Sequence, residues 1–287
     1  MTTNSSGGAA APDKTGKNET SKCFVLVHGA WHGSWVWQAV AAILRKQGHK
    51  VYTPVLSGLG ERTSILSADI TLDTFVADIE NAILHPQSAA SLDSQRHQSA
   101  DDFPTQNMGP LTNVILVGHS FAGPVISAVA ERIPEQLNRL IYLDAFLLQP
   151  GQSTFDTLDE KVRQSLRNAA EKHGGYGLPA PDPKHLGIPP DHASYKYVQE
   201  RLTPHPLNTY TTAVSSDNSG DERKSSAAGL KRIYLAYTEP AYKPVAAAYA
   251  WVKTQNDWTI DTLASSHSAP VLVPETLADK LQELAAV

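Results

Sequence analysis

The chain has 287 residues and a formal net charge of −5, a length that is sufficient for one large α/β domain with a full core. Mixed charges exclude a basic nucleic-acid surface and a polybasic membrane patch, and no apolar run reaches the ~18 residues of a membrane helix. The one cysteine, Cys23, excludes an internal disulfide and is typical of a reducing compartment, so we expect a cytoplasmic protein.

Short apolar strands alternate with helical patterns along the chain, which predicts an α/β fold with a mainly parallel sheet and helices on both faces. The first 22 residues are polar and are expected to form a disordered tail. The expected strands cover 24–27, 51–54, 114–117, 140–143, 232–237 and 258–260, and the expected helices cover 35–47, 71–84 and 124–132 and begin again at Pro244 and Pro274.

Two stretches interrupt this alternation and divide the predicted core into 23–148 and 232–287. Residues 86–110 are polar and predict a flexible surface insertion, with a partner-binding loop as the alternative. Residues 149–231 mix helical patches with Pro/Gly-rich turns and leave the C-terminal edge of the sheet. Because open α/β sheets bind ligands at that edge, we expect this second stretch to form a lid or cap.

The segment Gly118–Gly123 (GHSFAG) lies between the apolar strand 114–117 and a helical pattern. This layout predicts a nucleophile elbow with Ser120 exposed at a tight turn and the Phe121 N–H available to an oxyanion. Ala122 replaces the last glycine of G-x-S-x-G, but alanine is small enough for the turn. An ordinary strand-to-helix turn is the alternative, and the flanking strand and helix patterns favour a catalytic serine.

A serine nucleophile needs a base, and the base needs an orienting acid. His267 follows Ser120 in chain order on a loop near the C-terminus, so it is the expected base. Glu239, which follows strand 232–237, is the preferred acid. Asp144, after strand 140–143, is the alternative acid, although we expect its main role to be that of a loop or helix cap, and Asp257 and Asp261 are the remaining candidates.

The remaining site residues are expected around the turn after the first strand. The Ala30 N–H would complete the oxyanion hole with that of Phe121. Trp31, His119 and Phe146 are the candidate substrate-binding residues, and a place in the core is the alternative for the two aromatic ones. No HExxH or Cys/His ligand spacing is present, so we predict no metal and no cofactor.

Several segments together resemble the α/β-hydrolase superfamily, and more narrowly its branch of plant methylesterases, hydroxynitrile lyases and microbial esterase relatives. They are 28–37 (HGAWHGSWVW), 58–62 (GLGER), the Gly118–Gly123 elbow, 140–147 (LIYLDAFL) and, for the microbial members, 203–207 (TPHPL). The resemblance implies Ser120 as nucleophile, His267 as base and Ala30 and Phe121 as oxyanion donors. Because the family's acid is usually aspartate, Glu239 departs from the pattern and Asp144 stays open.

The resemblance also separates reaction types. Hydroxynitrile lyases of this branch carry a threonine after the first histidine and a lysine after the catalytic one, whereas this chain has Gly29 and Ser268. Without that lysine no cation stabilises a departing cyanide, so ester hydrolysis is favoured. We therefore expect a monomeric or homodimeric enzyme that hydrolyses a small, apolar or aromatic ester or lactone through an acyl-enzyme. A lyase or isomerase that uses the same pocket and a non-catalytic small-molecule receptor are the alternatives.

Overall fold

The computed structural model describes residues 21–86, 109–213, 227 and 229–286. Nearly all of the expected tail and of the expected 86–110 insertion lie outside these residues, as do 214–226 of the expected cap.

The core of the protein is a six-stranded sheet in the order β2-β1-β3-β4-β7-β8, in which every neighbouring pair is parallel. Its strands are β1 (Cys23–Val27), β2 (Lys50–Tyr52), β3 (Val114–His119), β4 (Leu137–Leu143), β7 (Lys231–Tyr237) and β8 (Trp258–Leu263). The two remaining strands, β5 (Gly177–Leu178) and β6 (His205–Pro206), form a separate antiparallel pair.

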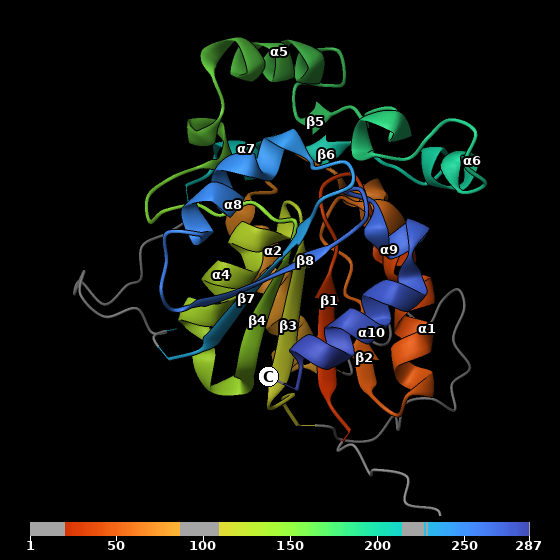
Figure 1. Ribbon diagram of the computed structural model, residues 1–287. Helices are drawn as coiled ribbons and strands as arrows, with labels where there is room; N and C mark the ends of the chain where they lie inside the picture. Colours follow the sequence, from red (N-terminus) through yellow and green to blue (C-terminus); the bar gives the residue numbers. More distant parts are fainter. Residues whose placement is uncertain (1–20, 87–108, 214–226, 228, 287) are drawn as a thin grey trace, which may run out of the picture.

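Helices cover both faces of the sheet (Figure 1). The α-helices within the described residues are α1 (Gln38–Lys46), α2 (Leu72–Leu84), α4 (Ala122–Arg132), α5 (Glu160–Glu171), α6 (Tyr195–Gln199), α7 (Asn208–Thr211), α8 (Ala246–Val252), α9 (Ala269–Leu272) and α10 (Pro274–Leu284). Apolar side chains of α2 and α4 pack with one set of strand residues, and those of α1 and α10 pack with the alternate set. The two-residue alternation of β-strands therefore divides the apolar core into two layers.

The fold class predicted from the sequence is confirmed, and all six expected strands are present in the core sheet. Two expected helices begin as 3₁₀ turns. The helix expected from residue 35 starts with the turn Ser34–Trp37 before α1, and the one expected from Pro244 starts with Lys243–Val245 before α8. Gly48 has φ +89° just beyond α1, a conformation in which glycine ends a helix without strain.

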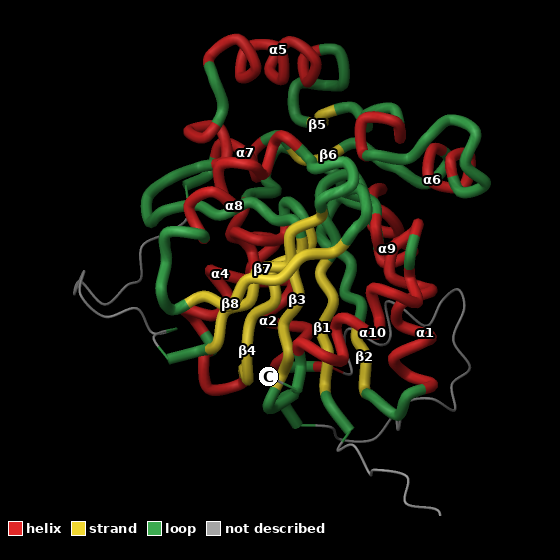
Figure 2. Tube along the Cα trace, viewed as in Figure 1, coloured by secondary structure: helices red, strands yellow, loops and turns green. Residues whose placement is uncertain are grey.

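The described residues 149–213, here called the cap segment, lie over the C-terminal ends of the strands (Figures 1 and 2). The inner part of the cap segment packs on the core, because the rings of His205 and Tyr210 lie with centroids 4.8 and 4.7 Å from that of Phe121. Its outer helix α5 buries only Ala170. The inner part of the cap segment therefore packs against Phe121 of the elbow, whereas helix α5 buries little of its surface.

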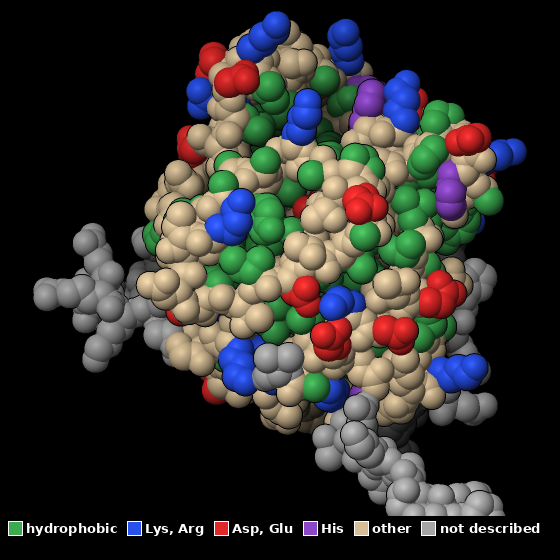
Figure 3. Space-filling model, in the orientation of Figure 1, with side chains coloured by type: hydrophobic (Ala, Val, Ile, Leu, Met, Phe, Trp, Pro, Cys, Tyr) green, Lys and Arg blue, Asp and Glu red, His purple; other side chains and the backbone are tan. Residues whose placement is uncertain are grey.

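The surface carries charges of both signs. Figure 3 shows Lys and Arg side chains interspersed with Asp and Glu over the visible face. Across the described ranges, no helix combines the length and apolarity that a bilayer crossing requires.

Candidate active site

The elbow predicted at Ser120 is formed by a sharp backbone turn between β3 and α4. Ser120 has φ +56°, a value that non-glycine residues seldom adopt and that directs the side chain away from the end of the strand, toward His267. A Cβ atom at Gly123 would lie 1.9 Å from the Phe146 carbonyl oxygen. The elbow thus requires glycine at 123, whereas Ala122 is accommodated in the first turn of α4.

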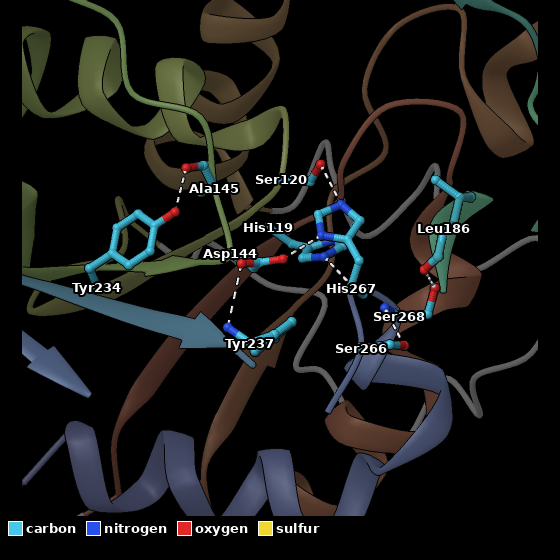
Figure 4. Close-up of polar contacts among 10 residues, drawn as sticks. All are labelled: His119, Ser120, Asp144, Ala145, Leu186, Tyr234, Tyr237, Ser266, His267 and Ser268. Carbon is cyan, nitrogen blue, oxygen red and sulfur yellow. Dashed lines mark hydrogen bonds and ion pairs between the residues drawn. The ribbon is translucent and has the colours of Figure 1, made fainter. Parts of the chain in front are cut away.

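Ser120, His267 and Asp144 form a continuous hydrogen-bonded chain (Figure 4). The Ser120 Oγ lies 2.9 Å from His267 Nε2, and His267 Nδ1 lies 2.7 Å from an Asp144 carboxylate oxygen. The three side chains come from the end of β3, the loop between β8 and α9, and the end of β4. All three are buried, with exposed fractions of 7%, 2% and 3%.

The preference for Glu239 as the orienting acid is corrected by this geometry. Glu239 is exposed, and its contact with the histidine loop is a backbone one, from its N–H to the Ser265 carbonyl at 3.0 Å. Asp144 lies near Ser120 because β4 is directly beside β3 in the sheet, and the loop after β8 brings His267 to both residues. The carboxylate of Asp144 also accepts a 3.4 Å hydrogen bond from the Tyr237 N–H of β7.

Burial decides the protonation of this pair. It lowers the pKa of the His267 imidazole, because the cation would lose its hydration, and it raises the pKa of Asp144 for the corresponding reason. His267 is therefore neutral at neutral pH. Its Nδ1–H donates to Asp144, which leaves the Nε2 lone pair directed at the Ser120 hydroxyl, the arrangement that a general base requires.

The predicted oxyanion donors lie on two turns that touch each other. A Cβ at Gly29 would come within 2.9 Å of the Ser120 Cβ, so the turn after β1 packs against the elbow. Within the described part of the chain, neither the Ala30 nor the Phe121 amide donates a backbone hydrogen bond. Both amides are thus available to a ligand oxygen.

His28 holds the Ala30 amide in place, a role that sequence reasoning missed. Its Nε2 accepts from the Leu56 N–H at 3.2 Å, so its Nδ1 carries the proton and donates to the Gly29 carbonyl at 2.9 Å. The Gly29 carbonyl and the Ala30 N–H belong to one planar peptide unit. This contact therefore orients the Ala30 donor.

The candidate substrate-binding residues lie in different surroundings. Phe146 adjoins the elbow, because its N–H donates to the Ser120 carbonyl at 3.0 Å. Trp31 is half-buried with φ +64°, and its carbonyl accepts from the Thr203 N–H of the cap segment at 2.9 Å. Phe146 thus lies next to the elbow, and Trp31 lies between the turn after β1 and the cap segment.

The expectation that His119 binds substrate is corrected. His119 is 1% exposed, and its Nε2 donates to the His267 backbone carbonyl at 2.9 Å (Figure 4). As the last residue of β3, its ring packs with Trp37 and Tyr237, two members of the core layer beneath the sheet edge. It supports the backbone of His267 instead of facing a ligand.

Tyr242 and Ser268 complete the surroundings of His267. The Tyr242 ring, on the loop after β7, stacks on the imidazole with centroids 3.7 Å apart and an interplanar angle of 19°. Nothing in the local pattern signals this contact, because it joins two distant loops. Ser268, which takes the place of the lyases' lysine, donates to the Leu186 carbonyl of the cap segment at 2.8 Å.

A parallel sheet that presents a serine at a strained turn, with a histidine and a carboxylate in line behind it, defines the α/β-hydrolase class. The model of the alpha/beta hydrolase family matches residues 24–284, and the chain belongs to this family.

Relatives with named activities are similar over different lengths. A carbendazim hydrolyzing esterase from Nocardioides sp. is 32% identical over 91% of this chain and 98% of its own length. Methyl jasmonate esterase 1 from Vitis vinifera is 30% identical, over 52% of this chain and 48% of its own length.

Solved structures share the fold. An extracellular α/β-hydrolase from a Paenibacillus species has a TM-score of 0.67 at 22% identity, covering 91% of this chain and 98% of that one. A pyrethroid hydrolase from Sphingobium faniae has a TM-score of 0.65 at 20% identity, covering 93% and 98%.

Proposed function

We propose that this protein is a serine esterase that cleaves a carboxylic ester of a small molecule through an acyl-enzyme. The observation that carries the proposal is the buried chain from the Ser120 Oγ through His267 to Asp144, with contacts of 2.9 and 2.7 Å. A neutral imidazole in that position can remove the serine proton, and the carboxylate stabilises the imidazolium that forms.

In the first half of the reaction, the Ser120 Oγ attacks the ester carbonyl carbon while His267 Nε2 takes the hydroxyl proton. The carbonyl oxygen becomes an oxyanion, which the Ala30 and Phe121 amides stabilise. His267 then gives its proton to the leaving alcohol as the C–O bond breaks. The acyl group is now an ester of Ser120.

In the second half, His267 removes a proton from water, which attacks the acyl carbonyl. The resulting tetrahedral intermediate collapses, His267 returns the proton to the Ser120 Oγ, and the carboxylic acid leaves. The hydrogen bond from Ser268 to Leu186 supports hydrolysis over cyanide elimination, because this position holds a neutral hydroxyl committed to the cap segment.

We infer the class of substrate from the names of the relatives and from the aromatic residues near Ser120. The similar proteins act, by their names, on carbendazim and methyl jasmonate, which supports a small-molecule ester as substrate. Phe146 next to the elbow and Trp31 in the turn after β1 support an apolar or aromatic acyl group, and a lactone would present the same carbonyl in a ring. We also propose a cytoplasmic location, for which the single cysteine is the supporting observation, and a monomeric or homodimeric state.

The proposal is tested with a panel of aryl and alkyl esters and lactones. We expect hydrolysis by the wild-type protein and a loss on the order of 10⁴-fold or more in kcat for Ser120→Ala. Undiminished hydrolysis by this variant, or none by the wild type, would refute the proposal.

The acid is tested with a matched pair of amide substitutions. Asp144→Asn should lower kcat on the order of 10⁴-fold, because the amide can no longer hold the imidazole in the required tautomer. Glu239→Gln, at an exposed carboxylate in the neighbouring loop, should stay within about twofold of wild type. The reverse order would move the assignment to Glu239.

A further inference from the structure

The face of the His267 imidazole is covered by one aromatic ring at stacking distance. The Tyr242 ring is nearly parallel to it, with an interplanar angle of 19° and a centroid separation of 3.7 Å. Tyr242 lies on the loop between β7 and α8, and its ring is only half-buried. The edge of the imidazole is occupied separately, with Ser120 at Nε2 and Asp144 at Nδ1.

Most of the other ionisable groups around His267 carry no negative charge that would stabilise its protonated form. His119, from the end of β3, has its ring centroid 4.7 Å away and donates to the His267 carbonyl. His32, from the turn after β1, has its ring centroid 6.3 Å from that of His119. Burial lowers the pKa of both, so they are neutral near pH 7, and Tyr237 contacts Asp144 through its backbone N–H. Among the described residues that face His267, Asp144 is thus the one group that can carry a negative charge.

We propose that the Tyr242 ring stabilises the protonated form of His267 by a cation–π contact and so acts, through His267, as a positioning residue of the esterase reaction. The negative face of an aromatic ring attracts a cation within about 6 Å, and more strongly where water is excluded. His267 is 2% exposed, and it becomes a cation only after it has taken the Ser120 proton. The contact therefore favours the tetrahedral intermediate over the resting enzyme.

The ring and not the hydroxyl carries this role. No hydrogen bond involves the Tyr242 hydroxyl among the residues that the structure describes, and burial together with Asp144 raises its pKa to about 12, so the phenol stays neutral. The inference rests on the proposed function, because it assigns His267 the base role. The inference adds Tyr242 to the residues that act in the reaction, beside Ser120, His267 and Asp144.

The test compares Tyr242→Phe and Tyr242→Trp, which keep an aromatic face, with Tyr242→Leu, which keeps apolar bulk without one. The strength of cation–π contacts predicts that Tyr242→Leu lowers kcat by about 2- to 30-fold with KM within twofold. It also predicts that the acid limb of the kcat/KM profile moves about 0.4 to 1.5 pH units lower, because the imidazolium has lost a stabilising contact. Tyr242→Phe and Tyr242→Trp should keep both values near wild type.

Tyr249→Leu, a half-buried tyrosine on the adjacent helix α8, is the matched control and should leave the acid limb in place. Melting temperatures establish that each variant is folded. An acid limb that is the same in Tyr242→Leu and Tyr242→Phe, with Ser120→Ala inactive, would overturn this inference alone. Full hydrolysis by Ser120→Ala would overturn the proposed function and this inference with it.

Discussion

Acid should unfold this protein steeply, because its site is built around buried neutral histidines. Five histidines are at most 4% exposed, namely His28, His32, His119, His205 and His267. Desolvation of the imidazolium lowers the pKa of each below the ordinary 6.5. The unfolded chain therefore takes up as many as five protons on acidification that the folded chain does not, so the stability that these histidines contribute is fully present above pH 6.5 and is lost as the pH falls.

The magnitude follows from the linkage between proton binding and folding. Asp144 opposes the histidines, since burial raises its pKa and the folded chain therefore binds this proton at a higher pH than the unfolded chain. The net difference is at most four protons, and at about 1.4 kcal/mol per proton and pH unit the free energy of unfolding falls by up to about 5 kcal/mol per pH unit. A domain with a stability of about 5 kcal/mol would unfold about one unit or more below pH 6.5, and a more stable domain would unfold at a lower pH.

The assay is urea unfolding followed by tryptophan fluorescence at half-unit steps from pH 7.5 to 5. We expect a constant midpoint above pH 7 and a steep decline below 6.5. His205→Leu should reduce the pH slope by about 1.4 kcal/mol per unit, because one proton uptake is removed. His185→Gln, at an exposed histidine, should leave the slope unchanged. A midpoint that stays constant down to pH 5 would refute the reasoning.

Three further predictions concern the elbow, the turn after β1 that carries the Ala30 N–H, and the base His267. Gly123→Ala should destabilise the fold by about 3 kcal/mol or more, because the new Cβ would lie 1.9 Å from the Phe146 carbonyl oxygen, whereas Gly109→Ala, with no atom within 4 Å, should leave the melting temperature nearly unchanged. His28→Phe should lower kcat by up to about 10²-fold at similar KM, because the Ala30 donor loses its anchor, and a variant with wild-type kcat would contradict that role. The acid limb of kcat/KM should lie below pH 6.5, because burial lowers the pKa of His267, and a limb above 6.5 would show that the Asp144 charge outweighs desolvation.

Features that depend on a few neighbouring residues were predictable from the sequence. A β-branched strand followed by a small-residue turn and a helix start is enough to predict the elbow at Ser120, because sterics within that turn decide which residues fit. The alternation of strand and helix patterns predicted the parallel sheet. His267 followed from chain order, and the structure places its Nε2 2.9 Å from the Ser120 Oγ.

The acid, the direction of His119 and the stacking of Tyr242 were decided by tertiary structure alone. Asp144 and Glu239 each follow a parallel strand, and local pattern cannot tell which carboxylate meets a histidine 123 residues from Asp144. The sheet order places β4 beside β3, and the turn after β7 leaves Glu239 in solvent while Tyr242 covers the imidazole. The nucleophile turn and the fold class can be predicted from the residues alone, since both arise from short-range sterics and periodicity. The partners of His267 arise from packing between loops that only the folded sheet brings together.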